Sequence, residues 1–416
     1  MSLPRYAAYK NSGVVWLGEI PVHWDIAPLK RMLDIQNGSD HKQIEVADGY
    51  PVIGSGGPFA YASEYIYDGE SVLLGRKGTV DRPMYVTGKF WTVDTMYWTK
   101  VSPDASGKFC YYAALTIPFD LYSTNTALPS MTKGVLSAHP IARPPYEEQS
   151  AIAAFLDRET GKIDALIAEQ EKLLTLLAEK RQATISHAVT RGLNSNAPMK
   201  DSGVPWLGDV PEHWQVRTIS SLSTKITNGF VGPTRDVLVD EGVRYLQSLH
   251  IKGNSIRFDS PYYVRQEWSE AHAKSILATG DVLIVQTGDI GQVAVVSDEF
   301  AGCNCHALII VTPVCDVVAG EWLSWALNSD YGFHSLLSIQ TGALHPHLNC
   351  GNVKNLFMPV PPIDDQSRII AYLQERLHGF EDLSGEAERA ITLLKERRSA
   401  LIAAAVTGKI DVRQVA

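Results

Sequence analysis

The sequence lacks the features of several protein classes. A membrane helix needs a run of about 18 apolar residues, and no run approaches that length. Residues 1–10 contain no signal-peptide core, so we expect a soluble, cytoplasmic protein with no membrane contact. The five cysteines are odd in number and lie mostly in apolar segments, which is typical of reduced thiols. Cys303 and Cys305 precede His306, but this spacing favours a strand over a zinc site, and we expect no metal.

An excess of positive charge is also missing. The net charge is −9, and the balances of residues 1–143, 144–199, 200–361 and 362–416 are 0, −2, −6 and −1. Any binding to DNA must therefore come from local basic patches or be helped by partner subunits. Taken alone, the charge favours a scaffold that joins other proteins.

Catalytic motifs are absent as well. The chain has no GxxxxGK[ST] loop, no paired carboxylates followed by lysine, and no nucleophile elbow. The triplet Pro144-Pro145-Tyr146 is like the base-gripping motif of amino-methyltransferases, but Arg143 before it offers no acceptor for an exocyclic amine. We therefore expect a chain that is not an enzyme, and a methyltransferase acting alone is the least favoured alternative.

What the sequence does contain is a long helical pattern. Residues 147–189 have no proline, and their apolar residues recur at spacings of three, four and seven, which predicts one amphipathic helix. About 40 residues give a rod on the order of 60 Å, a length typical of a spacer. Its predicted apolar seam is Leu156, Ile163, Ile167, Leu174 and Leu177.

The pattern occurs twice. The turn and helix that begin at Pro144 are repeated from Pro361, and the second seam at the same offset is Leu373, Phe380, Ile391 and Leu394. Two narrow seams most simply bury each other in a coiled coil, antiparallel or parallel. Ser384 and Gly385 interrupt the second seam, so we expect a weak or bent middle. The alternative is a pair of core helices in one ordinary domain.

A second block is also duplicated. Residues 11–24 reappear as residues 201–214, with nine of fourteen positions identical. The chain is therefore an internal tandem. We expect four tryptophans to anchor these arms to their own domains, and His23 and His213 to be structural. The four are Trp16, Trp24, Trp206 and Trp214.

The segments between arm and helix are not duplicated in sequence. Residues 32–142 and 223–360 contain strand-like runs at 71–74, 91–98, 281–285, 293–296 and 307–311, and a short helix at 320–328. The expected fold class is α+β, with two globular α/β domains at 1–143 and 200–361. The helical segments are 144–199 and 362–416. Constant ends with unlike middles predict one scaffold that presents two different surfaces.

Polar loops after the strands are candidate DNA-reading elements. Arginine and lysine suit guanine or phosphate, glutamine and asparagine suit adenine, and aspartate accepts from cytosine. A solvated turn is the alternative for every one of these residues. The candidates are Ser55, Gly56, Tyr61, Arg76, Lys77, Thr79 and Arg82 in the first domain, and Gln286, Thr287, Asp289, Thr341, His345, His347 and Asn349 in the second.

The order of these parts resembles a known family. An SGVxWLGxxPxHW arm, a variable α/β unit, a PPxxEQ-like turn and a long helix, all present twice, are similar to the specificity subunit of type I restriction-modification enzymes. The second turn reads Asp364-Asp365-Gln366, with aspartate in place of glutamate. The resemblance covers essentially the whole chain.

The resemblance implies two target recognition domains, each reading half of a bipartite DNA site, and an antiparallel coiled coil with pseudo-two-fold symmetry. It implies that two modification subunits methylate adenine and that restriction subunits act as motors. S-adenosylmethionine, ATP and magnesium are then expected in those partners, and no cofactor in this chain.

Overall fold

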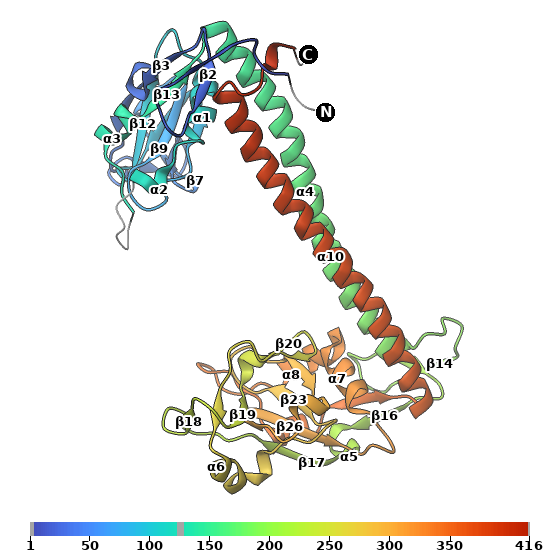
Figure 1. Cartoon of the computed structure of the whole chain (residues 1–416). Coiled ribbons are helices and arrows are strands. Elements are labelled where there is room, and N and C mark those ends of the chain that lie inside the picture. The colour runs from blue at the N-terminus through green and yellow to red at the C-terminus, as the bar shows by residue number, and fades with distance from the viewer. Residues whose placement is uncertain (1–3, 123–128, 415–416) are drawn as a thin grey trace. The chain divides into compact units, whose positions relative to one another are not determined.

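The computed structural model describes residues 4–122 and 129–414, and these form two compact units. Unit 1 comprises residues 1–171 and 388–416, and unit 2 comprises residues 172–387. Each unit contains mixed sheets, short helices and parts of two long helices (Figure 1). Among the described residues no helix is both long and apolar enough to cross a membrane.

The N-terminal arm of unit 1 is a hairpin. β1 (Tyr9–Asn11) pairs antiparallel with β2 (Glu19–Pro21), and the turn between them buries Leu17. The chain then forms β3 (Asp25–Pro28) and η1 (Leu29–Arg31). Trp24 is buried and Trp16 stacks on His139 with ring centroids 4.8 Å apart, as expected for anchors.

Unit 1 has two main sheets. An antiparallel sheet has the order β10-β9-β12-β4, and a mixed sheet has the order β5-β7-β6-β11-β8. The first contains β4 (Leu33–Asn37), β9 (Ser71–Gly75), β10 (Met84–Val86) and β12 (Met96–Val101). The second contains β5 (Glu45–Val46), β6 (Tyr50–Gly54), β7 (Gly57–Ala62), β8 (Tyr67–Asp68) and β11 (Lys89–Thr92).

One strand prediction in this unit is wrong. Residues 91–98 do not form a continuous strand, because Met96 N donates to Val93 O at 3.0 Å and closes a turn. That turn passes the chain from β11 in one sheet to β12 in the other. After β12 come α1 (Gly107–Ala114), α2 (Phe119–Tyr122), α3 (Lys133–Ala138) and β13 (Pro140–Arg143), which pairs with β3.

Unit 2 repeats this plan. An arm hairpin of β14 (Met199–Asp201) and β15 (Asp209–Pro211) leads to β16 (Gln215–Thr218), which pairs with β27 (Phe357–Val360). The antiparallel sheet β17-β26-β23-β24 contains β17 (Ser223–Asn228), β23 (Val282–Val285), β24 (Val293–Val295) and β26 (Leu308–Pro313). The second sheet contains β18 (Leu238–Val239), β19 (Val243–Leu246), β22 (Tyr263–Val264) and β25 (Asn304–Cys305).

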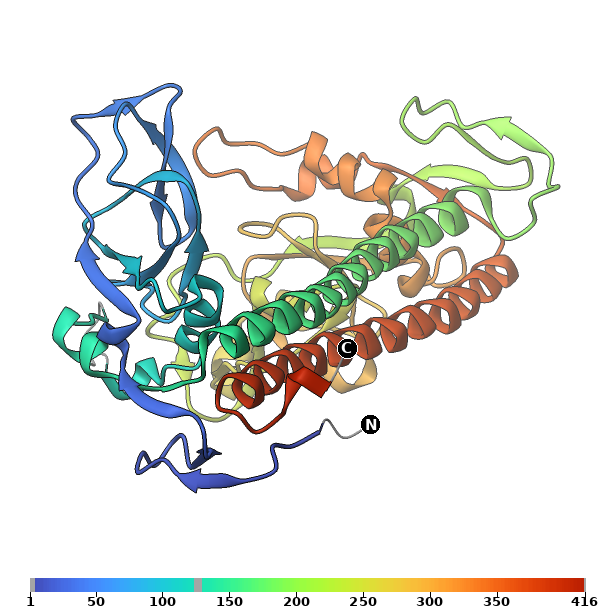
Figure 2. The same cartoon turned by 90° about the horizontal axis from the view of Figure 1, so that it is seen from above.

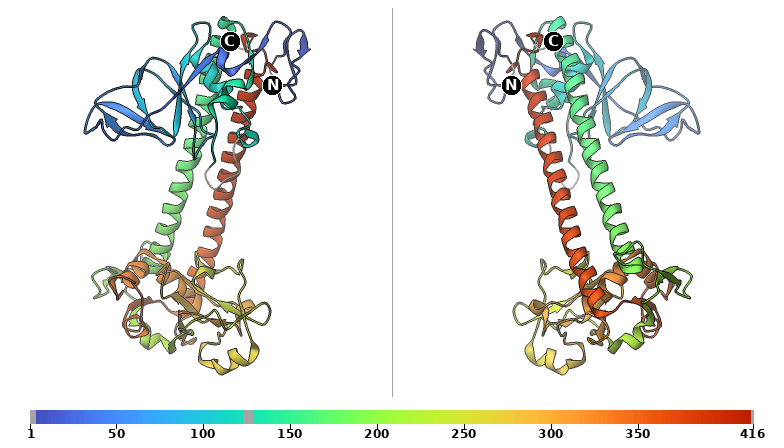
Figure 3. Two further views of the ribbon diagram at one scale, coloured as in Figure 1. Left: turned by 90° about the vertical axis from the view of Figure 1, so that its left-hand side faces the viewer. Right: turned by 90° about the vertical axis from the view of Figure 1, so that its right-hand side faces the viewer.

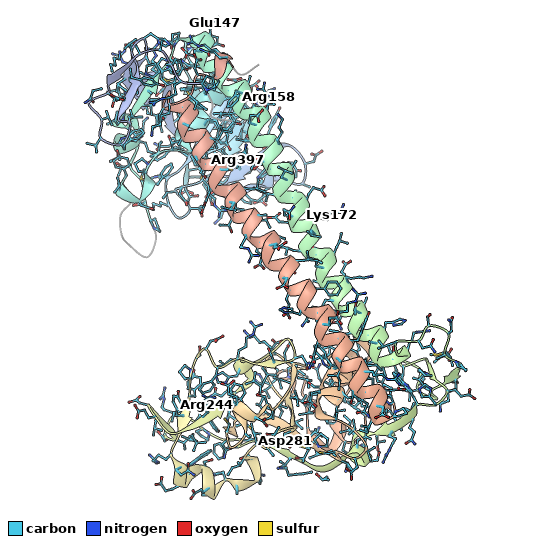
Figure 4. All side chains as sticks on the ribbon, turned by 45° about the vertical axis from the view of Figure 1, so that its right-hand side comes forward. Glu147, Arg158, Lys172, Arg244, Asp281 and Arg397 are labelled. Carbon is cyan, nitrogen blue, oxygen red and sulfur yellow. The ribbon has the colours of Figure 1, made fainter. Side chains whose placement is uncertain are left out.

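Short elements complete unit 2. A small hairpin joins β20 (Ile251–Lys252) to β21 (Ser255–Ile256). The α-helices are α5 (Ile219–Leu222), α6 (Gln266–Ala271), α7 (Gly320–Asn328), α8 (Asp330–Ser338) and α9 (Cys350–Val353). Asp281 is buried at the start of β23, where it accepts from the Ala278 amide at 2.8 Å and the Thr312 hydroxyl at 2.6 Å (Figure 4).

The two middle segments are alike in topology although their sequences differ. The four-stranded sheets have the same order when β4, β9, β10 and β12 are matched with β17, β23, β24 and β26. In both units a parallel pair, β6 with β11 and β19 with β25, lies in the second sheet. The scaffold is therefore duplicated throughout, and the unlike sequences lie on a common frame.

Two long helices contribute to both units. α4 extends over Tyr146–Arg191, and α10 extends over Ile363–Val406 without a break at Ser384 or Gly385. Within unit 1 the first part of α4 lies beside the last part of α10, and Arg398 Nε is 2.8 Å from Asp164 Oδ1 (Figure 3). Within unit 2, Arg181 lies 3.7 Å from Glu381. The two helices therefore have opposite directions within each unit.

The apolar side chains of the predicted seams are buried or half-buried. In unit 1, Leu156 of α4 shares a core with Ile402 and Val406 of α10. In unit 2, Ile185 of α4 shares a core with Leu373 of α10. The helices are thus part of each unit's core, which Leu156 shares with Trp24 in unit 1 and Leu373 shares with Trp214 in unit 2.

A glutamine attaches the start of each long helix to its unit. Gln149 accepts from the Ser106 amide and donates to Pro144 O, both at 2.9 Å. Gln366 likewise accepts from the Ala319 amide and donates to Pro361 O, both at 2.9 Å. Ser106 and Ala319 are the N-caps of α1 and α7, so the same bond fixes the same helix in both units.

The arm of unit 2 differs in one tryptophan. Trp214 is buried, but the side chain of Trp206 is 84% exposed. Its expected role as an anchor is therefore wrong. Trp16, the equivalent residue, is covered by His139, whereas the residue of unit 2 that corresponds to His139 is Leu356, which packs into the unit 2 core instead.

Candidate nucleic-acid interface

In unit 1 the loop after β9 is held by two other segments. The backbone amides of Arg76 and Lys77 donate to Thr95 O at 2.9 and 3.2 Å. Met131 N donates to Arg76 O at 2.9 Å, and Ser130 forms a β-bridge with Lys77. The Arg76 guanidinium donates to Asp94 O at 3.1 Å, while the Lys77 side chain is exposed. Two consecutive cationic residues are therefore carried by a backbone that hydrogen bonds to two other segments hold in place.

The hairpin between β6 and β7 adjoins this loop through residues 93–95. Val93 N donates to Ile53 O at 3.4 Å, and Arg76 contacts the next residue, Asp94. Ser55 and Gly56 form the tip of the hairpin, and Tyr61 lies further along β7 opposite Pro51. Thr79 and Arg82 lie further along the β9–β10 loop with exposed side chains.

In unit 2 most of the predicted residues come together. Leu348 N donates to Gln286 O at 3.0 Å, and Thr287 forms a β-bridge with His347. Thr341 and His347 exchange backbone hydrogen bonds of 3.0 and 2.9 Å, and their side chains lie 3.2 Å apart. His345 accepts through its backbone oxygen from His347 Nδ1 at 3.2 Å. Five candidates from two distant parts of the sequence thus form one surface.

Two further side chains in unit 2 behave differently. Asn349 Oδ1 accepts from the Asn352 amide at 2.8 Å and caps α9, so this oxygen has a structural partner. Asp289 is exposed on the same loop as Gln286.

The buried Gln286 Oε1 has no hydrogen-bond partner within residues 4–122 and 129–414. An unpaired buried acceptor is costly, so Gln286 Oε1 is a candidate to accept a hydrogen bond from a bound molecule.

The two surfaces have the same construction. In each unit the loop after a buried central strand pairs with the polar segment just before a capped helix, namely 129–131 before α3 and 341–348 before α9. Met131 and Leu348 anchor these segments in the core, and Thr132 and Asn349 cap the helices. The side chains differ: unit 1 presents Arg76 and Lys77, and unit 2 presents Thr287 and His347.

The sequence prediction missed the segment at Pro129-Ser130-Met131. A signal was present, because Met131 and Thr132 precede Leu348 and Asn349 by the same offset that relates the two turns. It also missed Phe59 and Leu344, whose side chains are 60% and 89% exposed beside the candidate loops. Apolar side chains of this kind can contact the methyl group of thymine.

The Cys303–His306 run contributes to the core of unit 2. Asn304–Cys305 is strand β25, and burial raises the pKa of the Cys305 thiol. Within the described ranges no three histidine, cysteine or acidic side chains are grouped as metal ligands.

The chain is similar to a protein family, to individual relatives and to solved structures. A family model described as type I restriction modification DNA specificity domain matches residues 21–175. The EcoBI type I specificity subunit of Escherichia coli is 22% identical over 95% of this chain and 88% of its own length. A putative type I specificity subunit of Haemophilus influenzae is 22% identical over 90% of this chain and 92% of its own.

Solved structures share the fold. A chain from a structure concerning complex assembly and conformational transition of the type I R-M system has a TM-score of 0.70 at 16% identity, and covers 93% of this chain and 98% of that chain. The HsdS subunit from Thermoanaerobacter tengcongensis has a TM-score of 0.51 at 15% identity, over 94% of this chain and 98% of its own. These findings confirm the resemblance seen in the sequence.

Proposed function

We propose that the chain is a type I restriction-modification specificity subunit and that each of its two units reads one half of a bipartite DNA target. The observation that carries the proposal is the repeated surface, built identically in both units but presenting different side chains. A common frame with unlike side chains is what two different half-sites require, because base edges differ in their hydrogen-bond pattern.

The chemistry of the two surfaces supports different readouts. Arg76 in unit 1 suits the O6 and N7 acceptors of guanine, and Lys77 suits guanine or phosphate. In unit 2 the Gln286 amide suits adenine, and the unpaired Gln286 Oε1 would gain a donor there. The zero net charge of residues 1–143 is compatible with this role if partner subunits supply the remaining cationic surface.

We further propose that α4 and α10 pair as an antiparallel coiled coil along their length and act as a spacer. The support is that both unit 1 and unit 2 contain an antiparallel section of the pair, with Asp164 facing Arg398 and Arg181 facing Glu381. The number of residues from Asp164 to Arg181 in α4 equals the number from Glu381 to Arg398 in α10. A single antiparallel register of the two helices therefore accounts for both contacts.

Apolar residues on the outer faces of these helices support docking of partners. Leu166 and Leu393 in unit 1, and Leu173, Leu176 and Leu383 in unit 2, are exposed. Exposed leucines repeated along a helix are typical of an interface with another helix. We propose that two modification subunits dock here and that restriction subunits join them, with S-adenosylmethionine, ATP and magnesium bound by those partners.

The decisive experiment exchanges one reading unit. Residues 29–139 lie between the paired strands β3 and β13, and replacing them with the equivalent segment of a relative leaves the arms and helices unchanged. We expect the methylated sequence, read by long-read sequencing of genomic DNA, to change in one half-site only. The matched control replaces residues 219–356, between β16 and β27, and should change the other half-site.

A change of both half-sites by either exchange would contradict independent readers. The isolated chain should also show no methyl transfer or cleavage until modification and restriction subunits are added. Methyl transfer by the chain alone, with S-adenosylmethionine and unmethylated DNA, would contradict the assignment of catalysis to its partners.

A further inference from the structure

The two units differ at the junction of arm, turn and helix end. In unit 1 the junction is filled by Tyr6, whose ring packs edge-on against Trp24 with centroids 5.7 Å apart. The Tyr6 hydroxyl donates to Glu148 Oε1 at 2.5 Å, and His23 Nε2 lies 2.9 Å from Glu148 Oε2. The C-terminal segment closes the site, since Asp411 N donates to Pro4 O at 2.8 Å (Figure 2).

The junction of unit 2 has the same walls but no such ring. His213, Trp214 and Asp365 are the equivalents of His23, Trp24 and Glu148, and His213 Nε2 lies 2.9 Å from Asp365 Oδ2. By the offset that relates the two arms, the residue equivalent to Tyr6 is Asn196, whose side chain is exposed. Between these walls lies a cavity of about 240 Å³ lined by Trp214, Ile369, Leu193 and Pro211 among others.

The cavity has the size and polarity of an aromatic binding site. An apolar cavity of about 150 Å³ is enough to take a benzene ring. Its carboxylate, Asp365, already has a cation, because Arg368 pairs with it one helical turn away. In unit 1 that position is Ala151, and Arg413 approaches Glu148 from the tail instead. Arg368 already donates to Asp365 Oδ1, and the residues that line this cavity of unit 2 include no tyrosine.

The surroundings have opposite charge in the two units. In unit 1, Arg413 packs over the Tyr6 ring and lies 3.7 Å from Glu148 and 2.8 Å from Asp411. In unit 2 the cavity is lined by Arg191 and Arg368, and a second hollow of about 370 Å³ that shares Gly192 and Leu193 adds Lys180. The hollow continues along α4, which gives room for a peptide segment as well as a ring.

We propose that this junction of unit 2, the socket formed by His213, Trp214, Asp365 and Ile369, binds a tyrosine side chain from an acidic segment of a second protein. The phenol ring enters the cavity beside Trp214, and its hydroxyl donates to Asp365, as that of Tyr6 does to Glu148. Acidic neighbours of the tyrosine pair with Arg191 and Lys180. This inference concerns protein recognition and does not depend on which DNA sequence the units read.

The test uses the full-length chain and short peptides in calorimetric titrations. Acetyl-Asp-Tyr-Asp-amide should bind with one site per chain. The phenylalanine analogue should bind about tenfold or more weakly, because the hydrogen bond to a charged acceptor is lost. Acetyl-Lys-Tyr-Lys-amide should also bind several-fold more weakly. Equal binding of the tyrosine and phenylalanine peptides, or no binding of the acidic peptide, overturns the proposal.

Three variants test where the peptide binds. Asn196→Tyr supplies the ring in cis and should abolish binding, whereas the matched Asn196→Ser leaves the socket open and should bind as the parent does. Tyr6→Ala opens the equivalent junction of unit 1 and should add a site that prefers the lysine-flanked peptide. Undiminished binding by a folded Asn196→Tyr chain contradicts the assignment.

If Asn196→Tyr does not fold, Arg191→Glu serves instead and should reverse the preference between the acidic and basic peptides. An unchanged preference overturns the proposal. Free p-cresol tests whether the site takes a small phenol or a tyrosine within a peptide. We expect p-cresol to bind far more weakly than the peptide. Binding of p-cresol as tight as that of the peptide would show a site for small phenols, and the proposed protein partner would be wrong.

Discussion

At the scale of single residues, the side chains that distinguish the two surfaces are few and are positioned by backbone contacts. Arg76 is the clearest case, because its backbone is bonded to Thr95 and Met131 while its guanidinium donates, among residues 4–122 and 129–414, one hydrogen bond, to Asp94 O. A guanidinium carries five N–H donors, so most remain available to a base.

Replacing Arg76 with alanine should weaken DNA binding by the assembled complex by about 1–3 kcal/mol and relax the sequence preference in one half-site. Arg76→Lys should not restore it, since an ammonium cannot bond bidentately to guanine. Competition binding with a panel of half-site variants measures both effects. Arg31→Ala, an exposed arginine of η1 in the same unit, is the control and should leave specificity unchanged.

His139 couples the stability of unit 1 to pH. Its ring is 2% exposed, and burial lowers its pKa to about 4 from the ordinary 6.5. The folded chain therefore holds the ring neutral between these values while the unfolded chain binds a proton. The stabilisation is complete above pH 6.5 and is lost as the pH falls from 6.5 towards 4, by up to about 3 kcal/mol.

Thermal unfolding of His139→Phe should therefore depend less on pH between 6.5 and 4 than that of the parent, because phenylalanine keeps the stack on Trp16 and removes the titrating group. A parallel His345→Phe variant, at an exposed position in unit 2, should retain the parental pH dependence. Identical pH profiles for the parent and His139→Phe would assign the acid sensitivity to other groups.

At the scale of elements, a glutamine just after the turn holds the start of each long helix to its unit. Gln366 makes three hydrogen bonds, to Ala319 N, Pro361 O and Val317 O, each at 2.9 Å, and is fully buried. It fixes the start of α10 to the start of α7.

Gln366→Ala should destabilise unit 2 by about 2–4 kcal/mol, since one buried and two half-buried backbone groups lose their partner. Hydrogen exchange resolved by peptide should show faster exchange in α7 and β27 with unit 1 unaffected. Gln149→Ala is the matched control and should have the reverse pattern, with faster exchange in α1 and β13. Faster exchange in both units from either variant would contradict local anchoring.

Many of the helices and strands could be predicted from the sequence. Period and spacing predicted the long helices, the short helix 320–328 and the strand at 71–74, because each has a strong local pattern. The turn at 93–95 was missed because Trp91 and Thr92 read as one β-type run with residues 96–98, and only pairing with a different sheet separates them. The clustering of Gln286 with His347 depends on a pairing between segments far apart in the chain, which no local signal contains.

At the scale of the whole molecule, the chain is an internal duplication whose two copies are alike in sequence in the arm and turn and unlike in the middle segments. The arm and turn kept their sequences, while the middle segments kept only strand order. The candidate residues themselves stay predictions, because which side chains meet base edges depends on docking geometry.

If the helices act as a spacer, the half-site centres should lie about 10 bp apart, one turn of DNA. Four residues inserted after Ala168, matched by four after Leu393 on the facing section of α10, add about 6 Å of helix and about 40° of rotation. The spacer should lengthen by one or two base pairs with both half-sites retained. Sequencing of methylated DNA measures this, and an unchanged spacer would leave the helices with a role in partner docking alone.

The pairing of β3 with β13, and of β16 with β27, has a genetic consequence. Each middle segment enters and leaves its unit through two adjacent strands, so its coding segment is bounded by codons whose products are hydrogen-bonded to each other. Recombination at these borders would exchange a complete module and leave the arms, turns and helices in register. If the middle segments read DNA as proposed, a single crossover event would then give a new methylation pattern without changes to the rest of the protein.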